Sequence, residues 1–109
     1  MQKQITRFDV YLIHLDPVRG HEIQKTRPCL VISPDEMNRQ LRTVIVAPMT
    51  TKGRAGPTRI PVHFEGKDGE IALDQLRTVD RERLIKHLGR IEEEVAEQVL
   101  EILQRMFSR

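Results

Sequence analysis

Residues 9–32 read DVYLIHLDPVRGHEIQKTRPCLVI, and this stretch decides the fold class. Its residues 10–15 are β-branched, aromatic and aliphatic, which predicts a strand over 9–16 that ends at Pro17. Residues 29–32 predict a second, buried strand that begins after Pro28, because proline cannot donate to a strand ladder. The polar connection between the two is too short for a parallel crossover, so an antiparallel pairing is expected.

Further short strands follow this pair along the chain. They are expected over 43–47, closed by Pro48; over 60–64, where Pro61 restricts the strand to an edge; over 70–73; and over 75–79, with Leu76 and Val79 inward. Residues 66–69 should form a turn, and residues 49–57 a basic loop rich in glycine and proline. Close spacing of short strands predicts a compact, partly open antiparallel barrel.

Three helical segments are expected. Ser33-Pro34-Asp35-Glu36 has the form of a capping box, with Ser33 as the N-cap of a short helix. Asp80 should cap another short helix that runs through Leu88 and stops at Gly89. The last helix is the clearest, because residues 91, 95, 99, 103 and 106 are apolar and fall on one face. Its apolar band is broader than one small barrel requires, which suggests that part of it, or an adjoining strand, meets a second subunit.

The 109 residues suffice for one domain, 1–109, mainly β with a C-terminal helix (α+β). With no Trp, one Tyr and three Phe, the chain has few aromatic platforms for stacking bases, so nucleic-acid binding must depend on charge and hydrogen bonds. The single cysteine excludes a disulfide framework and a zinc ribbon, and Cys29 itself is expected to be a buried, small hydrophobic residue. Without a signal core or an apolar span, a cytoplasmic protein with no membrane association is expected.

The net charge of +2 is unevenly distributed. Residues 19–59 hold eight basic residues against three acidic ones, a local charge of +5. Such a stretch attracts polyanions if its side chains gather on one surface, whereas scattered, solvated side chains would have no such role.

Two polar segments between expected strands are candidates for a site. The first, residues 19–28, holds His21, Glu22, Lys25 and Arg27, and the second, residues 48–52, includes two adjacent threonines. Loops held by rigid strands are where sites usually form, although a solvated connection and turn-forming hydroxyls are equally open alternatives. The four histidines have no metal-ligand spacing, and no phosphate-loop or dinucleotide glycine motif is present.

Together the motifs resemble the MazF/PemK-type mRNA interferases, the endoribonuclease toxins of type II toxin–antitoxin systems. The resemblance rests on the order and spacing of several motifs, which are residues 7–11 (RFDVY), 20–22 (GHE) followed by 26–28 (TRP), 33–35 (SPD), 46–51 (VAPMTT) and 74–81 (DQLRTVDR). The chain departs from the family at Phe8, where glycine is common.

The resemblance implies an SH3-like barrel of the MazF/CcdB type and a homodimer that cuts single-stranded RNA, chiefly mRNA, in a sequence-specific way without a metal ion or other cofactor. It implies a cognate antitoxin as partner. It also implies that Arg27 and Thr50 are the catalytic pair, and that the RNA 2′-hydroxyl attacks its own phosphate to leave a 2′,3′-cyclic phosphate and a 5′-hydroxyl.

These residue types suit that chemistry. Arg27 offers a fixed fork of donors to the oxygens of a pentavalent phosphorane, and Thr50 adds a hydroxyl. Arginine is a poor proton donor, so electrostatic stabilisation is expected from Arg27, while Glu22 or His21 could serve as a base. Expected RNA contacts are Lys25, Thr51, Lys52, Arg54, Gln75 and Arg77, of which Gln75 could contact a base edge.

Two other functions stay open. A CcdB-like inhibitor that clamps DNA gyrase would share the architecture without the chemistry of these loops. A passive RNA-binding barrel would bind RNA in a salt-sensitive way without turnover.

Overall fold

The computed structural model describes residues 4–51, 53 and 55–109. Along the chain lie β1 (Asp9–His14), β2 (Thr26–Val31), α1 (Asp35–Gln40), β3 (Thr43–Thr50), β4 (Arg59–Phe64), β5 (Lys67–Ala72), β6 (Arg77–Asp80), β7 (Leu84–Arg90) and α2 (Glu93–Met106). Two short 3₁₀ turns, η1 (Leu73–Gln75) and η2 (Arg81–Arg83), flank β6. The expected class, mainly β with one C-terminal helix, is confirmed.

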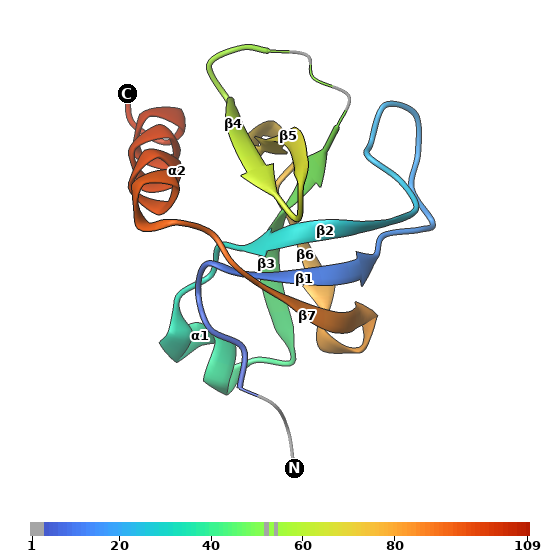
Figure 1. Cartoon of the computed structure of the whole chain (residues 1–109). Helices are drawn as coiled ribbons and strands as arrows, with labels where there is room; N and C mark the ends of the chain where they lie inside the picture. Colours follow the sequence, from blue (N-terminus) through green and yellow to red (C-terminus); the bar gives the residue numbers. More distant parts are fainter. Residues whose placement is uncertain (1–3, 52, 54) are drawn as a thin grey trace.

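All seven strands pair antiparallel in one curled sheet (Figure 1). The path is β4-β5-β3-β2-β1-β7, and β6 pairs with β3. The strand β3 changes partners along its length, since residues 43–46 pair with β6, residues 46–48 with β2 and residues 49–50 with β5. Because β3 pairs with three strands in turn, the sheet curls into a half-open, SH3-like barrel. The strand β4 lies at the edge of the sheet, as Pro61 predicted.

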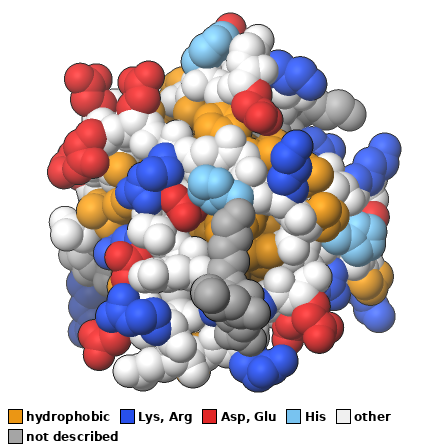
Figure 2. Space-filling view, turned by 60° about the horizontal axis from the view of Figure 1, so that its bottom comes forward, with side chains coloured by type: hydrophobic (Ala, Val, Ile, Leu, Met, Phe, Trp, Pro, Cys, Tyr) orange, Lys and Arg blue, Asp and Glu red, His pale blue; other side chains and the backbone are white. Residues whose placement is uncertain are grey.

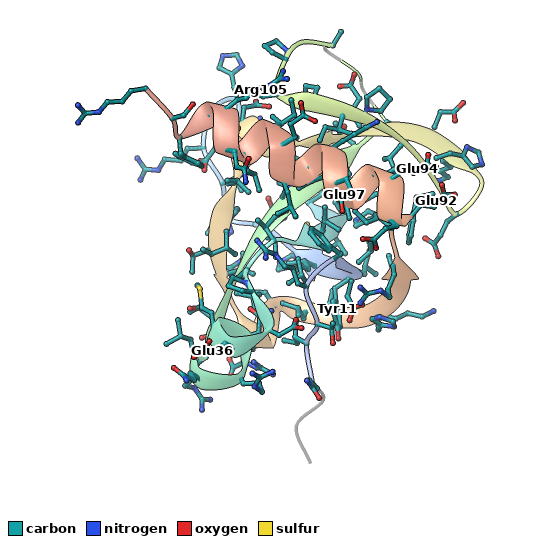
Figure 3. All side chains as sticks on the ribbon, turned by 90° about the vertical axis from the view of Figure 1, so that its left-hand side faces the viewer. Tyr11, Glu36, Glu92, Glu94, Glu97 and Arg105 are labelled. Carbon is teal, nitrogen blue, oxygen red and sulfur yellow. The ribbon has the colours of Figure 1, made fainter. Side chains whose placement is uncertain are left out.

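Apolar side chains fill both sides of the curled sheet. One cluster, with Val10, Leu30, Ile71 and Leu73 at its centre, is covered by α2 (Figure 3). A second cluster on the other face includes Cys29, which is fully buried as expected. Figure 2 brings the α1 end forward and shows acidic and basic side chains interspersed on that face.

The C-terminal helix α2 is as the sequence predicted, but its wide apolar band packs against the core of its own barrel. Ala96 and Val99 are buried in the first cluster, and Val95, Ile102, Leu103 and Met106 pack against it. The width of the band thus needs no second subunit. Among the described helices, none has the length and apolar character to cross a membrane.

The helix expected from Asp80 to Leu88 is wrong. Asp80 does accept a hydrogen bond from the Glu82 amide at 2.9 Å, but it caps only the 3₁₀ turn η2, after which β7 pairs with β1. Pairing with β1 satisfies backbone groups that would otherwise form a free edge, so this tertiary pairing outweighs a local helix preference. Gly89 lies within β7 opposite Val10 instead of ending a helix.

Four smaller expectations also need correction. The strand β2 begins at Thr26 and not after Pro28, which lies within the strand opposite Leu12. The N-cap of α1 is Pro34 and has no side-chain cap; Ser33 is buried and its hydroxyl hydrogen-bonds Asn38 Oδ1 at 2.5 Å. Pro48 does not close β3, which continues to Thr50 by exchanging β2 for β5. The turn expected over 66–69 lies earlier, because β5 already begins at Lys67 and contains Gly69.

Phe8 has a positive φ of 74°, which explains why glycine is common there in the resembling family. Its ring packs against the first cluster and lies 5.4 Å from the Arg7 guanidinium carbon. These contacts offset a backbone conformation that most side chains avoid.

Candidate active site

Arg27 is the second residue of β2, and within the described part of the chain its side chain makes one hydrogen bond. Its Nε donates to the Gln24 carbonyl at 2.8 Å, which fixes the base of the guanidinium. Arg27 forms no ion pair with any carboxylate of the described residues, whereas Arg59, Arg90 and Arg105 do. Its positive charge is therefore not neutralised by the protein, and the fork can accept an anionic ligand.

Thr50 ends β3 at the point where that strand pairs with β5. It is buried, with 7% of its surface exposed. Its backbone is closely approached by Gly69, since a Cβ on Gly69 would lie 2.7 Å from the Thr50 carbonyl oxygen. The position of Thr50 is thus fixed by two strands and by a glycine that permits them to approach.

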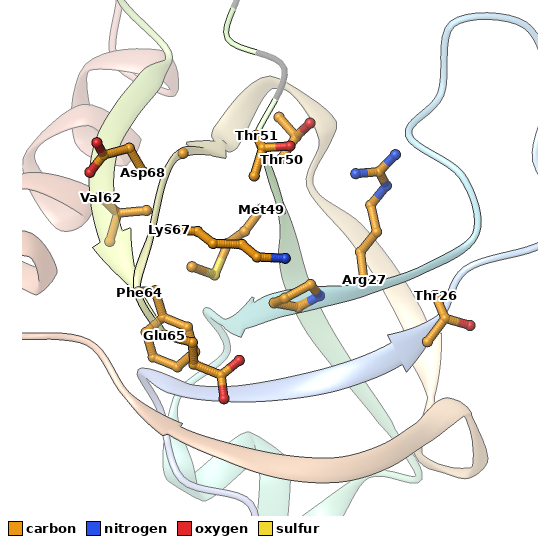
Figure 4. A pocket seen from close by; sticks show the side chains of 12 residues that line it. Thr26, Arg27, Met49, Thr50, Thr51, Val62, Phe64, Glu65, Lys67 and Asp68 are labelled. Carbon is orange, nitrogen blue, oxygen red and sulfur yellow. The ribbon is translucent and has the colours of Figure 1, made fainter.

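Arg27 and Thr50 both line two cavities, the first of which is shown in Figure 4. The hairpin cavity, about 270 Å³, lies between β2 and the β4–β5 hairpin and has Met49, Val62 and Phe64 in its wall. The loop cavity, about 390 Å³, lies under the β1–β2 loop and includes His21, Glu22 and Gln75. Because Arg27 and Thr50 belong to the linings of both cavities, this pair lies at the boundary that the two cavities share.

The β1–β2 loop is held over its cavity by side chains from the segment after β5. Gln75 Oε1 accepts from the Ile23 amide at 2.6 Å, and its Nε2 donates to the His21 carbonyl at 3.1 Å. Arg77 donates to the Leu15 carbonyl at 3.1 Å. Both ends of the Gln75 amide are therefore engaged with the loop, which makes Gln75 a positioning residue for His21.

His21 and Glu22 both line the loop cavity and a further cavity of about 420 Å³ that extends to Arg77. Both side chains are exposed. The Glu22 Oε1 accepts from the Arg19 amide at 2.6 Å and so closes a tight turn. His21 contributes only its carbonyl to the hydrogen bond with Gln75, which leaves the imidazole outside that contact.

A partly buried ion-pair network beside the site was missed by sequence reasoning. Arg59 lines the loop cavity, but its guanidinium is bidentate to Asp74, at 2.7 and 3.1 Å, and lies 3.8 Å from Glu70. The hydrogen bond between them raises the pKa of Arg59 and lowers that of Asp74. Glu70 also accepts from the Ala55 amide at 3.2 Å, so the network connects β5 and η1 to the β3–β4 loop.

The remaining expected RNA contacts fall into three groups. Thr51 lines the hairpin cavity and Arg77 the outer one. Lys25 is exposed, has a positive φ and lines none of the three cavities. Lys52 and Arg54 lie outside the described residues.

The other nucleophilic and metal-binding side chains lie apart from this site. Burial raises the pKa of Cys29 to about 12, so its thiol stays protonated. His14 pairs with Thr26 and His63 with Asp68 on the surface. No three His, Cys, Asp or Glu side chains of the described ranges gather as a metal site would require.

Comparison with known proteins adds a family and several similar folds. The sequence model described as PemK-like, MazF-like toxin of type II toxin-antitoxin system matches residues 6–107. MazF (Form-I) from Deinococcus radiodurans is 23% identical, with a TM-score of 0.85 over 96% of this chain and 97% of that one. The Mycobacterium tuberculosis toxin MazF-mt6 is 22% identical, with a TM-score of 0.76 over 91% and 95%. An endoribonuclease in complex with its cognate antitoxin, from Mycobacterial species, is 22% identical, with a TM-score of 0.79 over 93% and 92%.

Proposed function

Because the chain belongs to the PemK-like, MazF-like toxin family of type II toxin–antitoxin systems, we propose that it is an endoribonuclease that cuts single-stranded RNA, chiefly mRNA, at defined sequences without a metal ion. The observation that carries the proposal is the placement of Arg27. It carries an unneutralised guanidinium, and with Thr50 it forms the boundary between two cavities. A phosphate at this boundary would meet a bidentate donor and a hydroxyl.

The proposed reaction is an intramolecular transesterification. The ribose 2′-oxygen attacks the adjacent phosphorus, the bond from phosphorus to the 5′-oxygen breaks, and the products are a 2′,3′-cyclic phosphate and a 5′-hydroxyl. The nucleophile is already covalently placed beside the phosphorus, which removes the entropic cost of bringing it there. Arg27 stabilises the extra negative charge of the phosphorane, and the Thr50 hydroxyl donates to a second oxygen.

Proton transfer is assigned to His21 and solvent. The 2′-hydroxyl must lose a proton, and the exposed imidazole of His21 lines the loop cavity, where a ring nitrogen could accept it. Glu22 is the weaker candidate because one of its oxygens closes the turn with Arg19. The 5′-oxygen takes its proton from water, since arginine does not release one.

The products of cleavage test the proposal. Pure protein is incubated in EDTA with RNA of mixed sequence, and the new ends are mapped. We expect 5′-hydroxyl ends, cyclic phosphate or its opened 3′-phosphate, and no cutting of DNA. Replacing the single ribose before a mapped cut by 2′-deoxyribose should block that cut and leave binding intact. New 5′-phosphate ends, or an uninhibited deoxy substrate, would reject the mechanism, and binding without turnover would favour a passive RNA-binding barrel.

We further propose that the protein forms a homodimer. We also propose that a cognate antitoxin covers Arg27 and Thr50, at the boundary between the two cavities, with an acidic segment. The toxin family implies a protein antitoxin, and an acidic chain would compete with RNA for the same guanidinium. Light scattering should give twice 12.7 kDa at micromolar concentration. A persistent monomer would reject the dimer, and an antitoxin that binds without slowing RNA cleavage would reject the covered site.

A further inference from the structure

The hairpin cavity has a chemistry that the cleavage mechanism does not use. Its wall is apolar where Met49, Val62 and Phe64 contribute side chains, and it opens toward Arg27 and Thr50. Phe64 and Val62 also pack against the main apolar cluster, so this wall is part of a rigid core. A flat apolar group of a ligand could be held there against a fixed surface.

The charge at its mouth is also distinctive. Lys67, the first residue of β5, is exposed and forms no ion pair with any described carboxylate. Figure 4 shows its side chain reaching across the cavity toward β2, the strand that carries Arg27. The lining also holds two acidic residues. Asp68 hydrogen-bonds His63 at 2.8 Å, and Figure 4 shows its carboxylate turned away from Lys67. Glu65 is exposed and forms no ion pair with any described cation.

An apolar hollow bordered by two cations that form no ion pair with a described carboxylate matches one nucleotide of a single-stranded RNA, since a base has apolar faces and its backbone is anionic. We propose that the hairpin cavity binds the base of the nucleotide joined to the scissile phosphate on the side away from the β1–β2 loop, and that Lys67 binds the outer phosphate of that nucleotide. This inference rests on the proposed function, because the phosphate at Arg27 and Thr50 sets the position of the neighbouring base.

The position of Gly69 supports a cavity built next to the reacting phosphate. Gly69 lies opposite Val62 in the β4–β5 hairpin, lines the cavity and touches the Thr50 backbone. The cavity wall and the catalytic threonine are thus parts of one packed unit. A base seated in the cavity would be held at a fixed distance from the phosphate at Thr50.

Binding of an uncleavable RNA tests the Lys67 contact. The probe is a short RNA that the wild type cuts once, with 2′-deoxyribose at the cut, and its affinity is measured by fluorescence anisotropy over a salt series. Lys67→Ala should lower the slope of log affinity against log salt by about 0.7, the value for one phosphate contact on a single strand. Arg39→Ala, which removes one exposed charge from α1, should leave the slope unchanged.

Base removal tests the cavity itself. An abasic nucleotide on one side of the cut should weaken binding to the wild type roughly tenfold, as expected for loss of one stacked base. Val62→Phe fills the cavity. This variant should bind the intact probe about as weakly as the wild type binds the abasic probe, and its affinity should not fall further with the abasic probe. Thermal unfolding of Val62→Phe reports whether the variant is folded, and Lys67→Ala tests the site independently of packing.

The outcomes separate this inference from the proposed function. If the wild type cuts RNA but Lys67→Ala behaves as Arg39→Ala does, and the abasic loss persists in folded Val62→Phe, the cavity is not a nucleotide site. If Val62→Phe weakens only the antitoxin complex, the cavity belongs to the antitoxin and the inference is also wrong. Failure of the wild type to cut any RNA would overturn the proposed function, and this inference with it.

Discussion

Gly69→Ala is the substitution whose effect can be worked out most directly from the structure. The added Cβ would lie 2.7 Å from the carbonyl oxygen of Thr50 and 3.4 Å from its carbonyl carbon. Both groups are backbone, so neither can rotate away. Gly69 does not have a positive φ, so the close contact, and not backbone strain at position 69, determines the outcome.

Relief of this contact must move Thr50. Opening 2.7 Å to an ordinary contact of 3.4 Å requires a shift of about 0.7 Å between β5 and the end of β3. A misplacement of this order in a catalytic group lowers the rate by roughly 100-fold. Overpacking of a well-packed site also costs about 1–3 kcal/mol of unfolding free energy. We therefore expect a folded but less stable protein with a strongly reduced single-turnover rate.

The assay compares single-turnover RNA cleavage and thermal unfolding in Gly69→Ala and Gly66→Asn. Gly66 lies in the same hairpin, but a Cβ there meets nothing within 4 Å, and asparagine tolerates its left-handed backbone. This control should keep nearly the wild-type rate. A Gly69→Ala protein that matches the wild type in both rate and stability would show that Thr50 is not held by this contact, and would refute the reasoning.

Three other variants or treatments test separate parts of the account. Arg27→Lys should retain most RNA binding and lose about 100- to 1000-fold in cleavage rate, because lysine lacks the bidentate fork. Arg39→Lys on α1 is the matched control. Normal turnover in Arg27→Lys would show that Arg27 only attracts the substrate. Asp74→Asn should lower the unfolding free energy by about 0.5–1 kcal/mol at pH 7, because it removes the bidentate partner of Arg59 but the Asp74 side chain is 38% exposed and solvent screens the pair. Because the pKa of Asp74 is lowered from 3.8 in the folded protein, this difference should be present above that pH and disappear in denaturant titrations as the pH falls below it; a constant difference would contradict the ion pair. Cys29, with its pKa raised to about 12, should resist iodoacetamide at pH 8 until the protein is unfolded, as mass spectrometry would show, and rapid native labelling would contradict its burial.

The local pattern of the sequence was sufficient to predict those strands whose apolar residues recur within a few positions. The strands β1, β2 and β3 were predicted because their β-branched residues need a pleated, half-buried surface. The strand β7 was not, because residues 84–90 have no alternation of apolar and polar side chains. That segment is a strand only because β1 pairs with it, through two register shifts that no local pattern encodes.

The candidate site was predictable to the extent that its residues fell in the two polar segments expected between strands, although the structure places Arg27 in β2 and Thr50 in β3. That the two form a catalytic pair was implied by family resemblance and stays a prediction; the structure places both in the linings of the same two cavities. Arg59 was missed because its partners lie 11 and 15 residues further along the chain, on β5 and η1. For Gln75 the expectation was a base contact, yet its amide holds the β1–β2 loop more than 50 residues away in sequence. A contact across such a separation leaves no local signal except the polar residue itself.

The positive stretch over residues 19–59 shows why charge counted along a chain overestimates a binding surface. Arg39 lies on α1 and Arg42 directly precedes β3, whereas Thr50 ends that strand. Eight extended residues span roughly 25 Å. These two arginines therefore lie at the end of the barrel far from Thr50 (Figure 1). Arg59 is neutralised by its acidic partners. The fold instead adds Lys67, from outside the stretch, to the cavity beside Arg27. If the proposed function is right, attraction of RNA to the described part of this site depends on a few cations beside an apolar wall, and less on the local excess of +5.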